Sequence, residues 1–136
     1  MKNRFERLAP AQPDQLAPLR TAVWRHAQAL GASEEVAQAV RLAVGEALAN
    51  VVMHAYLEME PGSMTVQAWR DCDEHFVVRV LDEGRGLTPR TASPGLGLGL
   101  PLMAKMADDF SVDNREGTRG TTVSLRFSLR GLDATS

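Results

Sequence analysis

The feature that most constrains this fold is a long helical stretch that begins at Ser33. Ser33 can cap the helix, and Glu34 and Glu35 follow at its positive end. The stretch can run to about Glu58, before Pro61-Gly62 ends it. Much of its surface carries only small side chains: Ala37, Ala39, Ala43, Gly45, Ala47, Ala49 and Ala55. We therefore expect a helix that lies close against a sheet or a ligand.

Two polar residues interrupt this apolar helix. Glu46 and Asn50 are four residues apart, so they share one helix face. Polar groups that face a core cost free energy unless something satisfies them. The two side chains can satisfy each other, or they can serve a ligand. His54 extends the row by another four residues, and we interpret it as a structural member of the helix.

The rest of the chain predicts two further helices and five strands. Strands are expected at residues 3–9, 64–69, 75–81, 110–113 and 122–129, and helices from an N-cap at Asp14 to Gly31 and from Pro101 onward. In the last helix, Leu98, Leu102 and Met106 recur at intervals of four on one side. His26 falls on or beside the apolar stripe of the first helix, which favours a structural role.

This order of elements, β-α-α-β-β-α-β-β, predicts an α+β fold. An antiparallel or mixed, mostly antiparallel sheet with helices on one face is the economical architecture for it. The 136 residues are expected to form one domain, with residues 130–136 as a flexible tail.

Composition excludes several classes of function. The net charge of −2 leaves no basic surplus for binding nucleic acid through its phosphates. Cys72 is the only cysteine, so neither an internal disulfide nor a cysteine metal site is available. The sequence has no apolar run near 18 residues and no signal-peptide pattern. We expect a cytoplasmic domain that does not interact with a membrane.

A strand at 76–81 runs directly into the acidic, glycine-containing segment Asp82-Glu83-Gly84-Arg85-Gly86. Two glycines two residues apart let the backbone turn sharply and approach a ligand. An aspartate at the end of a strand can accept a hydrogen bond from an exocyclic amine, which would select adenine over guanine. Taken alone, the segment also fits an ordinary acidic turn.

Three other features suit a nucleotide. The run Gly95-Leu-Gly-Leu-Gly-Leu100 leads into a helix, whose free amides and positive end attract phosphate oxygens. The Asn50 oxygen can hold a magnesium ion, and Glu46 can orient or deprotonate a nucleophile. Gly120-Thr121-Thr122 opens the last strand. Together, and in this order, these features predict a nucleotide site.

The same blocks resemble a known superfamily. The Glu46-x-x-x-Asn50 pair, the segment from Asp82 to Gly86, the glycine run and the terminal Gly-Thr block resemble the GHKL ATPases. Within that superfamily, residues 46–56 (EALANVVMHAY) and 97–109 are similar to the anti-sigma-factor serine/threonine kinases, the RsbW-like group. The resemblance spans roughly residues 10–128, nearly the whole chain.

The resemblance implies a Bergerat fold, a two-layer α/β sandwich that holds ATP or ADP and Mg²⁺ between helices and sheet. Asn50 would then be the magnesium ligand and Glu46 the general base. Asp82 would bind the adenine amine, with Thr121 beside it. The glycines would line the ligand: Gly84 and Gly86 at the adenine, and the segment Gly97-Leu98-Gly99 at the phosphates.

The resemblance also implies a regulatory role. Members of the group phosphorylate a serine or threonine on a STAS-domain anti-anti-sigma partner and hold a sigma factor when that partner is absent; many are homodimers. This sequence departs from the group in one place. Only eight residues separate Gly86 from Gly95, and Ser93-Pro94 stand before the glycine run in place of an arginine. A second interpretation therefore stays open, a switch that binds ATP or ADP and a partner without phosphoryl transfer.

Overall fold

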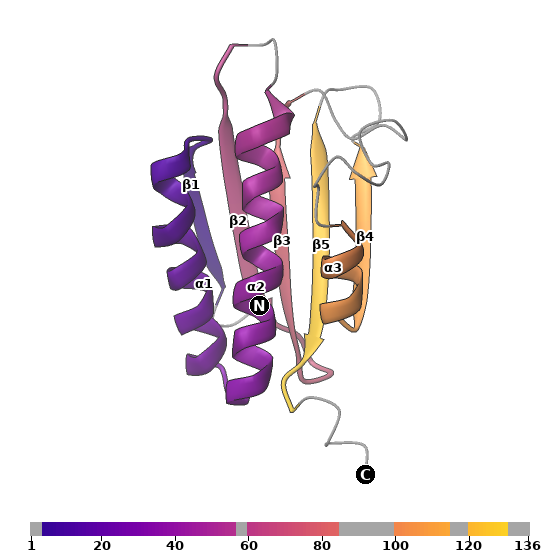
Figure 1. The fold of residues 1–136 in the computed structure, drawn as a ribbon. Coiled ribbons are helices and arrows are strands. Elements are labelled where there is room, and N and C mark those ends of the chain that lie inside the picture. Colours follow the sequence, from indigo (N-terminus) through magenta and orange to yellow (C-terminus); the bar gives the residue numbers. More distant parts are fainter. Residues whose placement is uncertain (1–3, 57–59, 85–99, 115–119, 131–136) are drawn as a thin grey trace.

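The computed structural model describes residues 4–56, 60–84, 100–114 and 120–130. A five-stranded sheet carries all of the α-helices described on one face (Figure 1). In chain order the elements are β1 (Phe5–Pro10), η1 (Pro13–Gln15), α1 (Leu16–Ala29), α2 (Glu34–Asn50), η2 (Val51–Ala55), β2 (Ser63–Arg70), β3 (His75–Asp82), α3 (Leu100–Met106), β4 (Asp109–Asn114) and β5 (Thr121–Ser128). The predicted order of helices and strands is confirmed.

The strands lie in the order β1-β2-β3-β5-β4. Each of the four neighbouring pairs is antiparallel, so the described sheet is antiparallel throughout and not mixed. The α+β, two-layer architecture is confirmed. The last strand, β5, follows β4 in the chain but lies between β3 and β4 in the sheet.

The core lies between the sheet and the helices. Alternate residues of the central strands face the helices and are buried: Met64, Val66 and Ala68 in β2, Phe76, Val78 and Val80 in β3, and Val123, Leu125 and Phe127 in β5. From the other layer, α2 contributes Val40, Val44 and Leu48. Removing this apolar surface from water is the main term that stabilises the fold.

The two long helices begin differently. Asp14 lies inside the 3₁₀ turn Pro13–Gln15, and α1 begins after it at Leu16, so the predicted cap at Asp14 is wrong. Proline at the start of that short turn fixes the backbone before the α-helix begins. The cap at Ser33 is confirmed, because its hydroxyl accepts a hydrogen bond of 3.1 Å from the Val36 amide.

The long helix ends earlier than the sequence suggested. After Asn50 it widens into the π-helical turn η2, and Tyr56 is its C-cap, so it ends at Ala55 and not near Glu58. From Glu34 to Ala55 it spans 22 residues and is long and apolar enough to cross a membrane by length and composition alone, so the expectation of no apolar stretch near 18 residues is wrong by this measure. Half of that window is buried inside the fold, and a core helix passes the same test.

His26 packs between two aromatic rings of the core. Its ring centroid lies 5.4 Å from that of Phe5 and 6.0 Å from that of Phe76. The predicted structural role of His26 is confirmed.

The short helix α3 uses a different apolar row from the one that the sequence indicated. Met103 is fully buried, whereas Leu102 is 40% exposed. Leu98 lies outside the described residues. Pro101 stands in the first turn, as predicted.

Candidate functional site

Buried polar side chains gather at one end of the molecule. In the part of the chain that the structure describes, they are Asn50, Asp82 and Thr121, exposed by 8%, 6% and 2%. All three are residues that the sequence assigned to a nucleotide site. They come from the ends of α2 and β3 and the start of β5, which meet at one end of the sheet (Figure 1). Because burying polar groups costs free energy, this concentration marks the candidate site.

The acidic and hydroxyl groups of the site lie on neighbouring strands. Asp82 and Thr121 are directly opposite each other in the β3–β5 ladder. The Asp82 Oδ1 atom accepts a hydrogen bond of 2.9 Å from the Gly84 amide, which orients the carboxylate. The Thr121 hydroxyl is within 3.2 Å of the Asn114 side-chain oxygen, to which it donates. The structure therefore brings Asp82 and Thr121 together, as the sequence predicted.

Gly84 joins the turn after β3 to the end of the long helix. A Cβ atom at this position would lie 2.1 Å from the carbonyl oxygen of Ala55 and 2.6 Å from its carbonyl carbon. Backbone atoms cannot move aside as a flexible side chain can, so only glycine fits here. This contact fixes the end of the helix, just beyond Asn50, against the strand end that carries Asp82.

Glu46 and Asn50 occupy the same face of α2, one turn apart. Asn50 is buried, whereas Glu46 is partly exposed. Within the described residues, the Glu46 carboxylate makes no hydrogen bond and no ion pair. A carboxylate that is reachable and has no partner is available to take a proton from an incoming group.

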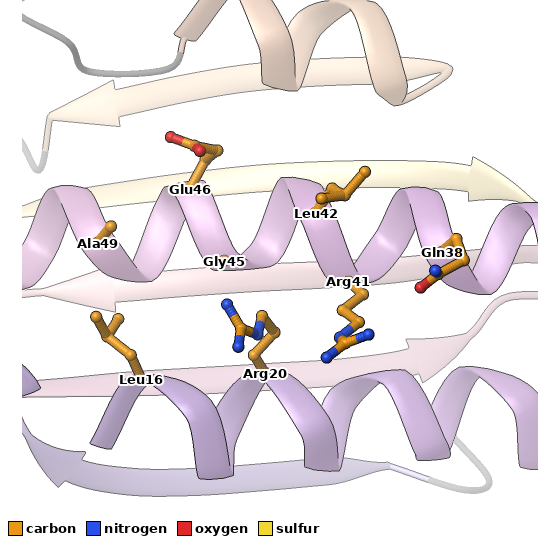
Figure 2. Close-up of a pocket in the computed structure, with 8 residues that line it drawn as sticks. All are labelled: Leu16, Arg20, Gln38, Arg41, Leu42, Gly45, Glu46 and Ala49. Carbon is orange, nitrogen blue, oxygen red and sulfur yellow. The ribbon is translucent and has the colours of Figure 1, made fainter. Parts of the chain in front are cut away.

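A groove of about 410 Å³ runs between α1 and α2 on the side away from the sheet. Figure 2 shows Arg20 and Arg41 within this groove, while Glu46 stands at its rim with the carboxylate directed away from α1. The groove is therefore distinct from the buried polar end of the fold, and Glu46 is accessible from the outer surface.

His54 continues the row of Glu46 and Asn50 into η2. Its Nε2 atom is buried and has no hydrogen-bond partner in the described part of the chain. A π-helical turn is rare and is found mostly as a single turn, frequently at functional sites. The turn η2 thus carries His54 at the end of the helix where the buried polar residues gather.

Tyr56 is a residue of this region whose role the sequence did not suggest. Its hydroxyl donates to the carbonyl oxygen of Ser63 at 2.6 Å and accepts from the Glu83 amide at 2.9 Å. Burial raises the pKa of Tyr56 above 10.0; the Glu83 hydrogen bond opposes this, and the charges of Asp82 and Glu83 add to it. The signals in sequence were a tyrosine at the end of an apolar helix and a glycine six residues later.

The other predicted residues lie outside the described part of the chain: Gly86, Gly97, Leu98 and Gly99. Among the described residues, no cluster of three or more histidine, cysteine or acidic side chains could hold a metal. A magnesium ion that accompanies a nucleotide keeps phosphate and water ligands and needs only one or two protein groups. The Asn50 amide oxygen, at the polar end of α2, fits that requirement.

The fold and the site define a class. An antiparallel sheet covered by helices on one face, with buried polar groups where the long helix meets the strand ends, is the Bergerat-type ATPase architecture. Residues 9–127 match the histidine kinase-like ATPase domain, and the chain belongs to that family. It is 30% identical to the serine-protein kinase RsbW of Bacillus subtilis, over 96% of this chain and 91% of the relative. It is 31% identical to an anti-sigma F factor of Caldanaerobacter subterraneus, over 68% and 69%.

Solved structures share the fold. The RsbU and RsbW domains of a Mycobacterium tuberculosis protein superpose with a TM-score of 0.72 at 20% identity, over 95% of this chain and 34% of that longer one. A histidine kinase domain from Erythrobacter litoralis superposes with a TM-score of 0.60 at 22% identity, over 82% and 61%. At these identities the likeness confirms the fold.

Proposed function

We propose that this protein is an ATP-binding anti-sigma factor with serine/threonine kinase activity. It would phosphorylate a STAS-domain anti-anti-sigma partner and sequester a sigma factor when that partner is unavailable. The names of its relatives, a serine-protein kinase and an anti-sigma F factor, support this assignment. The family match supports nucleotide binding.

Asp82 would recognise the base. Its carboxylate accepts a hydrogen bond from the exocyclic amine of adenine, whereas guanine presents a carbonyl oxygen at that position and would be repelled. Thr121, opposite Asp82, adds a hydroxyl at the same edge of the base. The burial of Asp82 sharpens the discrimination, because the repulsion between a carbonyl oxygen and a carboxylate is stronger away from water.

Glu46 would act on the partner. The proton of the partner's serine or threonine hydroxyl passes to the Glu46 carboxylate as the hydroxyl oxygen bonds to the γ-phosphorus of ATP. The bond between that phosphorus and the β–γ bridging oxygen breaks, and ADP leaves. Asn50 would hold a Mg²⁺ ion, which would supply neutralisation of phosphate charge. The protein contributes to the transfer through the position of Glu46, which is accessible from the outer surface and lies one turn from Asn50.

One observation carries the proposal. The buried polar residues of the described chain coincide with the predicted nucleotide residues, and the carboxylate of Glu46, which has no partner among the described residues, lies one turn before Asn50. A helix that only packed on the sheet would gain stability from apolar residues at the position of Asn50.

The test is transfer of radiolabelled phosphate from ATP to a cognate STAS protein. We expect transfer by the wild type and a loss of at least about 100-fold in Glu46→Gln, because general bases contribute about that much or more. ATP affinity should stay unchanged, since Glu46 acts on the hydroxyl and not on the base.

Glu34→Gln is the matched control, because it removes a carboxylate at the far end of the same helix. It should leave transfer intact. Loss of ATP binding in Glu46→Gln would instead assign Glu46 a structural role. A wild type that binds ATP yet transfers no phosphate would remove the kinase half of the proposal.

The alternative is a partner switch that binds ATP or ADP without turnover. It is favoured by the sequence between Gly86 and Gly95, which has only eight residues, with Ser93-Pro94 before the glycine run. Phosphoryl transfer depends on positioning and charge neutralisation around the transferred group. Such a switch would bind nucleotide and partner but leave no phosphopeptide detectable by mass spectrometry.

The remaining assignments follow from this function. We propose a cytoplasmic protein that acts as a homodimer on two protein partners and contacts neither nucleic acid nor membrane directly. Sedimentation of the wild type with and without ATP checks the homodimer.

A further inference from the structure

Tyr56 connects three segments at the end of the fold that carries Asn50, Asp82 and Thr121, here called the site end. These segments are the end of the long helix, the start of β2 and the turn after β3. Tyr56 caps the long helix after η2, and its hydroxyl bridges the carbonyl oxygen of Ser63 and the amide of Glu83. Its ring lies on Gly62, where a Cβ atom would come within 2.2 Å of ring carbon Cε1. The tyrosine is thus seated on the start of β2 and reaches across to the end of β3.

The Glu83 amide is the central group of the turn that follows β3. The residues on either side of Glu83 are joined, because the Asp82 carboxylate accepts a hydrogen bond of 2.9 Å from the Gly84 amide. Gly84 also packs against the backbone of Ala55, with no room for a Cβ atom. The turn is therefore held to the helix end at two points, the Gly84–Ala55 contact and the Tyr56 hydroxyl.

We infer that Tyr56 is a positioning residue that sets the base selectivity of the site by fixing the turn from Asp82 to Gly84. This inference rests on the proposed nucleotide function and concerns a residue that need not touch the nucleotide. The Gly84 amide orients the Asp82 carboxylate, and the Tyr56 hydroxyl fixes the peptide group between them. A carboxylate distinguishes an amine from a carbonyl only if its direction is held, so a looser turn discriminates less.

A purely structural tyrosine would behave differently. Without its hydroxyl, water can satisfy the exposed Glu83 amide, and the fold keeps the ring on Gly62. A structural role predicts a lower melting temperature and an unchanged preference for ATP over GTP. A positioning role predicts a reduced preference.

The experiment is calorimetric titration of the full chain with ATP and with GTP. Tyr56→Phe removes only the hydroxyl. We expect its affinity for ATP to fall about tenfold, the size of one hydrogen bond, while GTP binding changes little. The exchange of the Glu83 amide with solvent should also become faster in this variant.

Ser33→Ala is the matched control, because it also removes a single hydroxyl group that hydrogen-bonds to the backbone, at the opposite end of the same helix. It should lower the melting temperature without altering the ratio of ATP to GTP affinity. If Tyr56→Phe keeps the wild-type ratio, or if Ser33→Ala changes it equally, the inference is wrong while the nucleotide function stands. If the wild type itself shows no preference for ATP, the proposed function fails and the inference fails with it.

Discussion

The two ends of the sheet hold their polar groups in opposite ways. At the site end, Asn50, Asp82 and Thr121 are buried, and the Asp82 carboxylate accepts a hydrogen bond from the backbone amide of Gly84. At the other end, the β2–β3 hairpin lies beside the end of β5 (Figure 1), and its polar groups form ion pairs that are partly buried at Asp71 and exposed at Asp73. The first arrangement holds buried groups through uncharged partners, whereas the second gathers several aspartates around one arginine.

Arg126 is the centre of the hairpin end. Its guanidinium lies 3.0 Å from Asp71, 3.3 Å from Asp73 and 3.4 Å from Asp109. Burial on its own would raise the pKa of Asp71, but hydrogen bonds from the His75 amide, Arg126 and the Asp73 amide lower it below 3.8. Asp73 and Asp109 are exposed, so their pairs with Arg126 contribute little individually and weaken with salt, whereas the Asp71 pair is partly buried. A change at Asp73 or Asp109 should therefore cost less than a change among the buried groups of the site end.

The largest effect should come from crowding the site end. In Gly84→Ala the new methyl group would overlap the Ala55 backbone, so the strand end and the helix end must separate. We expect a loss of about 3 kcal/mol in the free energy of unfolding, measured by urea denaturation, because overpacking of a rigid contact costs about that much. Nucleotide affinity should fall as well.

Gly45→Ala is the control for that variant. A Cβ atom at Gly45 meets only the flexible side chain of Arg20, at 3.0 Å, which can move aside. Alanine also favours a helix by about 1 kcal/mol over glycine. Equal destabilisation by the two substitutions would contradict the close approach at Gly84.

An intermediate effect is expected at the hairpin end in acid. The folded-state pKa of Asp71 is depressed, so its contribution to stability is present above 3.8 and is lost as the pH falls through the folded value. Arg126→Gln should destabilise less than Gly84→Ala, lose its effect in high salt and flatten the acid limb of the stability curve. Arg25→Gln, an exposed arginine on α1, should do none of these. An unchanged acid limb in Arg126→Gln would contradict the assignment.

The smallest effect is expected at the site end, where stability should fall at alkaline pH as Tyr56 loses its proton. Because the folded-state pKa of Tyr56 is raised, its contribution is present below 10.0 and is lost as the pH rises through the folded value. Tyr56→Phe should lack this alkaline loss of stability. Tyr56 is the only tyrosine, so the ultraviolet absorbance of tyrosinate reports its titration directly. If the Tyr56 hydroxyl titrates with the ordinary tyrosine pKa of 10.0, the burial of this hydroxyl is contradicted.

Much of this layout follows from the sequence. Periods of two and of three to four residues predict the order of strands and helices, because burial of one face dictates both patterns. The nearness of Asp82 and Thr121 is implied only by the resemblance to the GHKL ATPases, because the sequence alone does not say that β3 and β5 are neighbours. Asp14 shows where this reasoning fails: a proline-initiated 3₁₀ turn takes the place of the expected cap.

Long-range contacts explain the other differences. Tyr56 bonds to groups 7 and 27 residues away, and no periodicity encodes such pairs. The π-helical turn η2 likewise depends on what packs against the helix end, where Gly84 meets Ala55. Met103 replaces Leu102 as the buried side chain of α3, which places the buried side of this short helix one residue away from the row that spacing alone indicated.

The most direct test of the central claim is titration of the wild type with ATP and with GTP, in the presence and absence of Mg²⁺. A site built on Asp82 and Asn50 predicts that ATP binds at least about 100-fold more tightly than GTP, because guanine would set a carbonyl oxygen against the buried Asp82 carboxylate. It also predicts that Asp82→Asn loses this preference and that Asn50→Ala loses the effect of Mg²⁺. Equal affinities for ATP and GTP in the wild type would contradict the account of this end of the sheet as an adenine nucleotide site.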